Sequence, residues 1–285
     1  MLKKILSIVT ILCILCGCGG IEIIDDTSTP NQGSQQENDK IPEYQGKAYV
    51  TIGDGIPNFS EEEKEADVFE TYYPLDDLGR CSGAYAMLGV ELMPNRPRGD
   101  IYMIKPTAWQ SSRYNFVDGE SLYNRCHLIA HQLAGEDANE QNLITGTRYM
   151  NTEGMLSFEE MVGDFIRETK MHVLYRVTPH YEGDNLLASG VEMEAYSIED
   201  DGEGICFHIY AYNVQPDVFI SYETGYNCLE KTAYDEVEVR ANKQSHVYHL
   251  PGMEAYNKMK TSYNLITFDC EADAILAGYR KANYD

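Results

Sequence analysis

The clearest periodic pattern in the chain lies between residues 157 and 166. Apolar residues recur there at intervals of three and four, the spacing of one face of an α-helix; they are Phe158, Met161, Val162, Phe165 and Ile166. Ser157 and Glu160 have the spacing of a capping box, so we predict that a helix begins at Ser157. Glu159 would then lie in its first turn, beside the apolar face.

Three segments after this helix have strand patterns. They are rich in β-branched and aromatic residues and are separated by the turn-forming sequences YEGDN and EDDGEG. The short connections predict an antiparallel meander, formed by residues 171–178, 186–198 and 205–213.

The region before the helix mixes short apolar runs with proline and glycine. GAYAMLGVELMPNRPRGDIYMIKP predicts two strands joined by a loop from Pro94 to Gly99. SLYNRCHLI predicts a strand that ends near His127, followed by the loop AGEDANEQN. Together the patterns indicate an α+β fold, with an antiparallel sheet core flanked by helices.

Length and composition indicate how the chain is divided into domains. With 285 residues, 43% of them hydrophobic, the chain can bury one large core and a smaller one. We assign residues 46–228 to the main domain. A charged stretch predicts a linker over 229–245, and residues 246–285 would form a small C-terminal module.

The N-terminus has the proportions of an export signal. Lys3 and Lys4 precede a short apolar run, and LCGC resembles the lipobox of bacterial lipoproteins, in which the residue matching Cys18 is lipidated. We predict a signal peptide over 1–18, a flexible tether over 19–45, and a lipid-anchored protein on the extracellular face of the bacterial membrane. Release from the cell, or an uncleaved membrane anchor, is the alternative.

The formal net charge of −24 argues against broad binding of polyanions. The charge is unevenly distributed, however, because the stretch from Arg80 to Asn151 has as many basic as acidic residues. That stretch can contact phosphate. Five cysteines follow Cys18, at positions 81, 126, 206, 228 and 270, and their number and spacing leave the disulfide question open.

The segment YNRCHLIAHQ, residues 123–132, concentrates reactive side chains. On a strand, adjacent Cys126 and His127 point to opposite faces, which disfavours a thiol nucleophile with a neighbouring base. HLIAH has the histidine spacing of a zinc metalloprotease, but Leu128 stands where that chemistry needs glutamate. A histidine acting alone as a base remains, with His131 expected to pack or face solvent.

The sequence NRCHLIAHQLAGEDANEQNLITGTRYMN resembles the signature of the DNA/RNA non-specific endonucleases, a branch of the ββα-metal (His-Me finger) nucleases. The first element of that signature is usually Asp-Arg-Gly-His. The similarity covers roughly residues 75–225 and includes HVLYRVTP and GEGICFHIYAYNVQP. It is specific because four separated positions fit together, namely His127, Asn142, Asn151 and Glu159.

The resemblance implies a role for each position. His127 would be the general base, Asn151 the ligand of a magnesium or manganese ion, and Asn142 and Glu159 would order the water around that ion. Arg98 in RPRGDI would meet the phosphate, in preference to Arg96. Arg96, Arg125 and Arg148 are further candidates for substrate contacts. The implied reaction is hydrolysis of a phosphodiester of DNA, with RNA as a second substrate, to leave a 5′-phosphate.

Two positions depart from the family pattern. Asn124 replaces the usual aspartate and Cys126 the usual glycine, which changes how His127 is held. In the tail, VYHLP resembles a small metal-binding module of some secreted nucleases, but Gly252 and Met253 stand where a cysteine follows, so we expect no zinc there.

Two other functions compete with a nuclease. One is a catalytically silent surface protein of the same fold that binds nucleic acid, and the other is an adhesive surface lipoprotein with an acidic, tyrosine-rich exterior. Metal-dependent cleavage of DNA separates the nuclease from the first, and retention of DNA at low salt separates a receptor from the second.

Overall fold

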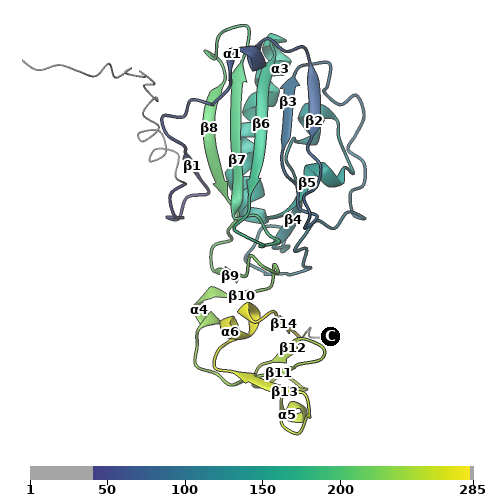
Figure 1. Cartoon of the computed structure of the whole chain (residues 1–285), viewed down its shortest axis with the longest axis vertical. Coiled ribbons are helices and arrows are strands. Elements are labelled where there is room, and N and C mark those ends of the chain that lie inside the picture. The colour runs from purple at the N-terminus through teal and green to yellow at the C-terminus, as the bar shows by residue number, and fades with distance from the viewer. Residues whose placement is uncertain (1–40, 283–285) are drawn as a thin grey trace, which may run out of the picture. The chain divides into compact units, whose positions relative to one another are not determined.

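The structure, a computed structural model, describes residues 41–282. Its largest sheet has six strands, and every neighbouring pair is antiparallel (Figure 1). In spatial order the strands are β1 (Tyr49–Thr51), β8 (Cys206–Tyr212), β7 (Gly190–Ser197), β6 (Val173–His180), β3 (Ala84–Leu88) and β2 (Phe69–Tyr72). The meander predicted from the sequence is β6, β7 and β8, which confirms the α+β assignment.

One face of this sheet packs against helix α3 (Leu156–Thr169), which lies behind the strands in Figure 1. Phe158, Val162 and Ile166 of the helix share a core with inward-facing side chains of β6, β7 and β8, and the Phe158 and Phe207 ring centroids are 4.9 Å apart. The predicted apolar face is thus confirmed, except that Met161 is largely exposed.

The start of this helix differs from the prediction. A π-helical turn, η2 (Met150–Met155), runs directly into α3, and no side chain caps the N-terminus of α3. The predicted capping box of Ser157 and Glu160 is therefore wrong, because the residues before Ser157 already have helical backbone. The π turn carries Asn151. Such turns often mark functional sites.

Two shorter strands, β4 (Tyr123–His127) and β5 (Leu143–Thr147), form a separate antiparallel pair. The strand predicted to end at His127 is therefore confirmed, and β4, β5 and α3 form a ββα unit. Short helices accompany it: α2 (His131–Ala134) follows β4, η1 (Glu140–Asn142) precedes β5, and α1 (Glu61–Lys64) lies earlier in the chain. The strand predicted for IYMIKP is absent, because residues 101–107 form turns.

The C-terminal residues build a second core. A hairpin of β9 (Val218–Ile220) and β10 (Asn227–Leu229) leads to a four-stranded sheet in the order β13-β11-β12-β14. Its strands are β11 (Val239–Asn242), β12 (Val247–His249), β13 (Leu265–Phe268) and β14 (Arg280–Lys281); its helices are α4 (Glu230–Ala233), α5 (Tyr256–Met259) and α6 (Glu271–Leu276).

The predicted linker over 229–245 is wrong. Strand β11 pairs with both β12 and β13, and Val239 and Ala241 are fully buried in the C-terminal core. The charges that suggested a linker belong to side chains on the solvent side of short elements. The module therefore includes these residues.

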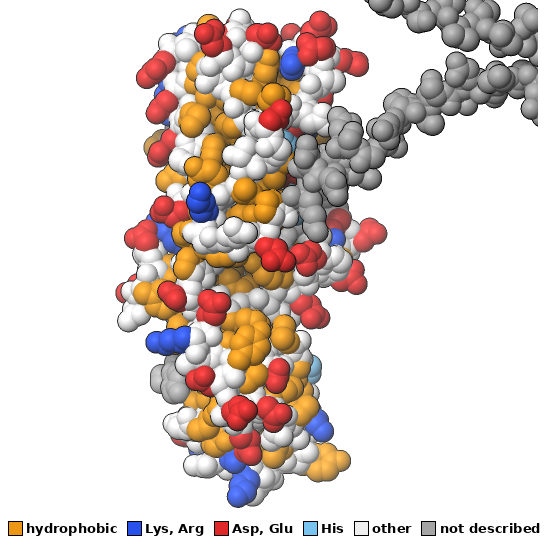
Figure 2. Space-filling view, turned by 90° about the vertical axis from the view of Figure 1, so that its left-hand side faces the viewer, with side chains coloured by type: hydrophobic (Ala, Val, Ile, Leu, Met, Phe, Trp, Pro, Cys, Tyr) orange, Lys and Arg blue, Asp and Glu red, His pale blue; other side chains and the backbone are white. Residues whose placement is uncertain are grey.

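All five cysteines of the described part of the chain are free thiols, so none of them forms a disulfide. No helix within residues 41–282 is long and apolar enough to cross a membrane. The predicted signal peptide, its lipidated Cys18 and most of the tether lie outside the described residues. Acidic side chains are spread over the face drawn in Figure 2, whereas basic ones are sparse there.

The face of the sheet opposite α3 carries a cluster of histidines and carboxylates. Glu192 on β7 is bonded through its two oxygens to Nε2 of His180, at 2.7 Å, and Nε2 of His208, at 2.5 Å. The ligand atoms of Glu192, Glu194 and His208 lie within 4.8 Å of one another, which a metal ion could use. Glu194 is already paired with Arg176, however, at 2.7 Å.

We expect this cluster to make stability depend on pH. The bonds to His180 and His208 lower the pKa of Glu192 from 4.5 to about 2, so its contribution is present above pH 4.5 and is lost as pH falls toward 2. Burial lowers the pKa of His208, but its bond to Glu192 outweighs this and raises it above 6.5. The contribution of His208 is therefore complete below pH 6.5 and is lost above.

Urea unfolding of the parent and of Glu192→Gln between pH 2 and 8 measures this effect. The parent should be more stable by about 2 to 3 kcal/mol between pH 4.5 and 6.5, with a smaller difference at both extremes. A difference that does not vary with pH would contradict the assignment.

Candidate active site

A pocket of about 580 Å³ opens between the end of β4 and the start of α3. It brings together six of the residues singled out from the sequence: Arg98, Arg125, His127, Arg148, Asn151 and Glu159. Three arginines and two histidines line it, against one carboxylate, Glu159. In a chain with a net charge of −24, this is a local site suited to an anion.

His127 ends β4 and is 8% exposed. Its Nε2 lies 3.0 Å from the backbone oxygen of Asp137. A carbonyl oxygen only accepts, so Nε2 carries the proton in this bond and Nδ1 of the neutral ring keeps a free electron pair. Burial, with a smaller contribution from the charge of Arg98, lowers the pKa of His127 to about 4. The ring is therefore uncharged at neutral pH.

Cys126 points away from His127, as its strand position predicted. It is fully buried, and a Cβ placed on Gly146 would lie 2.3 Å from its Sγ. The sulfur occupies space that a side chain on β5 would otherwise fill, which explains how β4 accommodates a cysteine where the family has glycine. Burial raises the pKa of the thiol above its ordinary value, so it is no nucleophile.

Glu159 and Asn151 reach the pocket from α3 and from the π turn before it. Burial raises the pKa of Glu159 to about 8, nearby Glu160 adds to this, and Arg98 opposes it. No donor within residues 41–282 bonds the Glu159 carboxylate. Without a cation this carboxyl group is protonated at neutral pH, and a bound cation would favour its carboxylate form. Together with the amide oxygen of Asn151 in the same pocket, it is a donor set that fits a hydrated, oxygen-preferring cation such as magnesium.

Asn142 lies outside this pocket. It is fully buried, its Oδ1 accepts from the backbone N–H of Ile129 at 2.8 Å, and its Nδ2 donates to the oxygen of Ile129 at 3.0 Å. The expectation that Asn142 orders water around a metal therefore fails, because both amide groups are used. It instead ties the chain just after His127 to the start of β5.

Replacing this residue should test that role. Asn142→Leu leaves two buried backbone groups without partners, and we expect the free energy of unfolding to fall by about 2 to 4 kcal/mol. Urea unfolding followed by circular dichroism gives the value. Asn139→Ala, which loses one local bond to the N–H of Gln141, is the milder control. Equal stability of parent and Asn142→Leu would contradict the role.

The remaining arginines have different partners. Arg96 does not line the pocket and forms an ion pair with the Asp137 carboxylate at 2.6 Å, which also accepts from the N–H of Gly99 at 2.7 Å. In this structure Arg96 supports the segment that bonds His127, and its contact with substrate stays a prediction. Arg148 lines the pocket but is paired with Asp118 at 2.6 Å.

Arg125 lines the pocket, but its guanidinium contacts other groups of the protein. It donates to the backbone oxygens of Tyr102, at 2.8 Å, and Ile104, and lies 4.0 Å from the centre of the Trp109 ring. These contacts give Arg125 a positioning role, and its contact with phosphate stays a prediction. Trp109 and Ile101, which also line the pocket, were missed because nothing in their sequence context marks them.

Two polar side-chain atoms of the pocket residues form no hydrogen bond within the described part of the chain. Nδ2 of Asn124 is buried without a hydrogen bond. Nε2 of His131 lies 3.3 Å from an oxygen of Asp137, but the geometry is not that of a hydrogen bond. His131 was expected to pack or face solvent, and it lies at the pocket wall.

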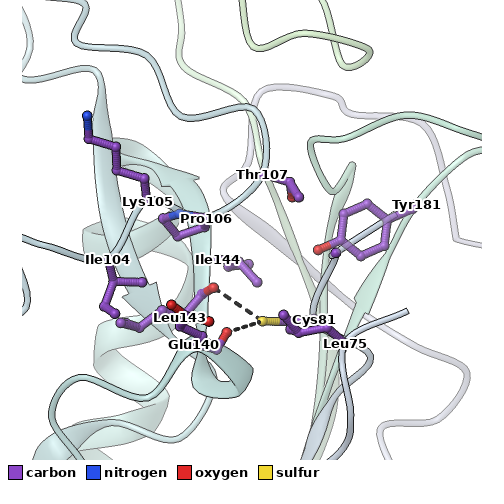
Figure 3. Close-up of a pocket in the computed structure, with 11 residues that line it drawn as sticks. Leu75, Cys81, Ile104, Lys105, Pro106, Thr107, Glu140, Leu143, Ile144 and Tyr181 are labelled. Atoms are coloured by element: carbon purple, nitrogen blue, oxygen red, sulfur yellow. Dashed lines mark hydrogen bonds between the residues drawn. The ribbon is translucent and has the colours of Figure 1, made fainter. Parts of the chain in front are cut away.

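A smaller pocket of about 180 Å³, drawn in Figure 3, lies around Cys81. The thiol contacts the backbone oxygens of Glu140 and Leu143 at 3.1 and 3.2 Å, and burial raises its pKa to about 12. No histidine lines it. The thiol is therefore protonated at neutral pH, and none of the motif residues lines this pocket. The larger pocket is the candidate for chemistry.

The family model of the DNA/RNA non-specific endonucleases matches residues 59–199, which include the whole set of pocket residues. The chain belongs to this family. It is thus a DNA/RNA nuclease, and the pocket beside the ββα unit is its candidate active site. The C-terminal module lies beyond the matched residues.

Solved structures support the same fold. NucA from Streptococcus agalactiae with magnesium bound is similar with a TM-score of 0.58 and 23% identity over 64% of this chain and 89% of NucA. The metal-free form of NucA gives 0.55 and 24% over 64% and 87%. Sda1 nuclease with a bound zinc ion gives 0.51 and 23% over 63% and 95%. No curated protein matches the chain.

Proposed function

We propose that this nuclease hydrolyses phosphodiester bonds of DNA, and of RNA as a second substrate, with His127 as general base and magnesium as cofactor. The observation that carries the proposal is the bond from Nε2 of His127 to the oxygen of Asp137. It leaves Nδ1 as the basic nitrogen, in a pocket that also holds Arg98, Asn151 and Glu159.

His127 would take a proton from water through Nδ1. The uncharged ring is available at neutral pH, and the Asp137 oxygen stabilises the imidazolium that forms. The water, once deprotonated, attacks phosphorus and the bond to the leaving oxygen breaks.

Asn151 and Glu159 would hold the cation, the first as ligand and the second through its water shell. A bound magnesium ion stabilises charge on the phosphate and the leaving oxygen. Oxygen donors favour magnesium or manganese over zinc, which prefers nitrogen and sulfur. The magnesium in NucA supports this choice, whereas Sda1 holds zinc.

Arg98 would bind the scissile phosphate. Arg98 lines the same pocket as His127 and Glu159, and its charge lowers the pKa of both. No ion pair within residues 41–282 involves Arg98, in contrast to Arg96 and Arg148. It is the arginine whose guanidinium is available for an anion.

We also propose that the protein works outside the cell, anchored through a lipid on Cys18, with the tether before residue 46 separating the nuclease domain from the membrane. This rests on the two lysines, the apolar run and the LCGC sequence. The nuclease domain would span residues 46 to about 228, followed directly by the C-terminal module.

Degradation of a supercoiled plasmid, with and without EDTA, tests the function. We expect cleavage with magnesium or manganese, none with EDTA, and recovery when excess magnesium is added. Cleavage that persists in EDTA would contradict a metal-dependent reaction, and absence of cleavage under all conditions would favour a silent nucleic-acid-binding protein.

A further inference from the structure

A turn beside the active-site pocket exposes two large apolar side chains. The N–H of Ile104 donates to the oxygen of Ile101 at 3.1 Å, which places Tyr102 and Met103 at the corners of the turn. Tyr102 is 69% and Met103 83% exposed, while Ile101, at the base of the turn, lines the pocket. The turn thus presents an aromatic and a thioether side chain to solvent next to the pocket.

Several contacts hold this turn in one conformation. Arg125 donates to the oxygens of Tyr102 and Ile104, and its guanidinium lies 4.0 Å from the Trp109 ring centre and 5.3 Å from that of Tyr102. The N–H of Tyr102 donates to Oδ1 of Asp100 at 2.7 Å. Because Arg125 and Trp109 both line the pocket, the turn is positioned relative to the catalytic residues.

We propose that Tyr102, supported by Met103, is a stacking platform for an unpaired nucleobase next to the scissile phosphate, so that the substrate class favoured is single-stranded or locally unpaired nucleic acid. This inference rests on the proposed function of the pocket. In a duplex each base is already stacked on its neighbours, whereas a single strand leaves its base faces free for an aromatic ring.

The charge of the protein gives a physical reason for such a platform. With a net charge of −24, long-range attraction cannot hold a polyanion, and two of the basic residues at the pocket, Arg125 and Arg148, are engaged by the protein itself. Stacking depends little on charge and on base identity. It therefore supplies affinity without the sequence preference that a non-specific nuclease must avoid.

Tyr102→Ala keeps the hydrogen bonds of the turn to Arg125 and Asp100, because these use the backbone of Tyr102. It removes the ring together with its contact to the Arg125 guanidinium. The substrates are a single-stranded oligonucleotide, the same sequence as a duplex, and an abasic deoxyribose-phosphate chain of the same length. Tyr102→Phe keeps the ring, and Tyr263→Ala removes a fully exposed tyrosine of the C-terminal module as the matched control.

We expect Tyr102→Ala to lower kcat/KM on the single strand by at least about 5-fold, with little change on the duplex and none on the abasic chain. Tyr102→Phe and Tyr263→Ala should behave like the parent. An unchanged single-strand rate, or an equal loss on the abasic chain, would overturn the proposal.

A binding measurement without catalysis tests the stacking platform independently of the proposed function. Trp109 is the single tryptophan of the chain and lines the pocket, so its fluorescence reports binding of the single strand in the presence of EDTA. If the parent cleaves nothing, the proposed function fails. A weaker affinity of Tyr102→Ala, by at least about 5-fold, would then still support the platform, and an equal affinity would overturn it.

Discussion

His127→Ala should lower kcat for plasmid cleavage by about 100- to 10,000-fold, the usual contribution of a general base. The structure gives the reason: the ring is buried, uncharged, and bonded through Nε2 so that Nδ1 is the available base. Alanine provides no group that accepts a proton. Initial rates under saturating magnesium and substrate measure the effect.

Two controls make this result specific. His172→Ala removes a partly exposed histidine that is paired with Glu199 and does not line the pocket, and its rate should equal that of the parent. Circular dichroism must show that His127→Ala is folded. A folded His127→Ala that cleaves as fast as the parent would exclude His127 as the base.

The pH profile gives an independent view of the same group. Because the pKa of His127 is lowered to about 4, the basic form predominates above that value, and protonation at lower pH removes the base. We expect kcat/KM to fall as pH decreases through about 4, with no acidic limb near pH 6.5. Rates of the parent in buffers from pH 3.5 to 8, at constant ionic strength, measure it. A midpoint near 6.5 would show that the ring is more solvated than its burial indicates.

Arg98→Ala should have the second largest effect, a decrease of about 100- to 1000-fold in kcat, as found for loss of one charged or polar group that stabilises a transition state. Arg98 influences the pKa of both His127 and Glu159, and it is free of ion pairs among the described residues. Arg98→Lys should recover part of the rate, because it keeps the charge but loses the two parallel hydrogen bonds of a guanidinium.

Arg113→Ala is the matched control, since the Arg113 side chain is 70% exposed and is paired with Glu120. Its rate should not change. A rate of Arg98→Ala within about threefold of the parent, with unchanged unfolding, would show that another cation meets the phosphate, and Arg148 would then be the next candidate because it lines the same pocket.

Much of the nuclease domain was predictable because its signals are local. The 3.6-residue period of α3 and the alternation in β6, β7 and β8 follow from which side chains must face the core. The start of the C-terminal module was missed because its local signal is weak. Strand β11 has four residues, too few to show a periodic pattern, and the charged residues around it resemble those of a linker.

In the candidate active site, too, the sequence identified some residues, whereas the roles of others depended on tertiary contacts. Motif spacing identified His127, Asn151 and Glu159, and the pocket includes all three. The four arginines could not be ranked fully by sequence, because their roles depend on partners: Asp137 for Arg96, Asp118 for Arg148, and the 102–104 turn for Arg125.

The sequence by itself therefore determined the fold class, the order of the main elements and the residue types able to do the chemistry. Only the tertiary structure decided which nitrogen of His127 is free, that Asn142 is a structural group, and that Tyr102 stands exposed beside the pocket. The physical reason is that periodicity and motifs report contacts within a few residues, whereas protonation, ion pairing and exposure are set by neighbours brought together from distant parts of the chain.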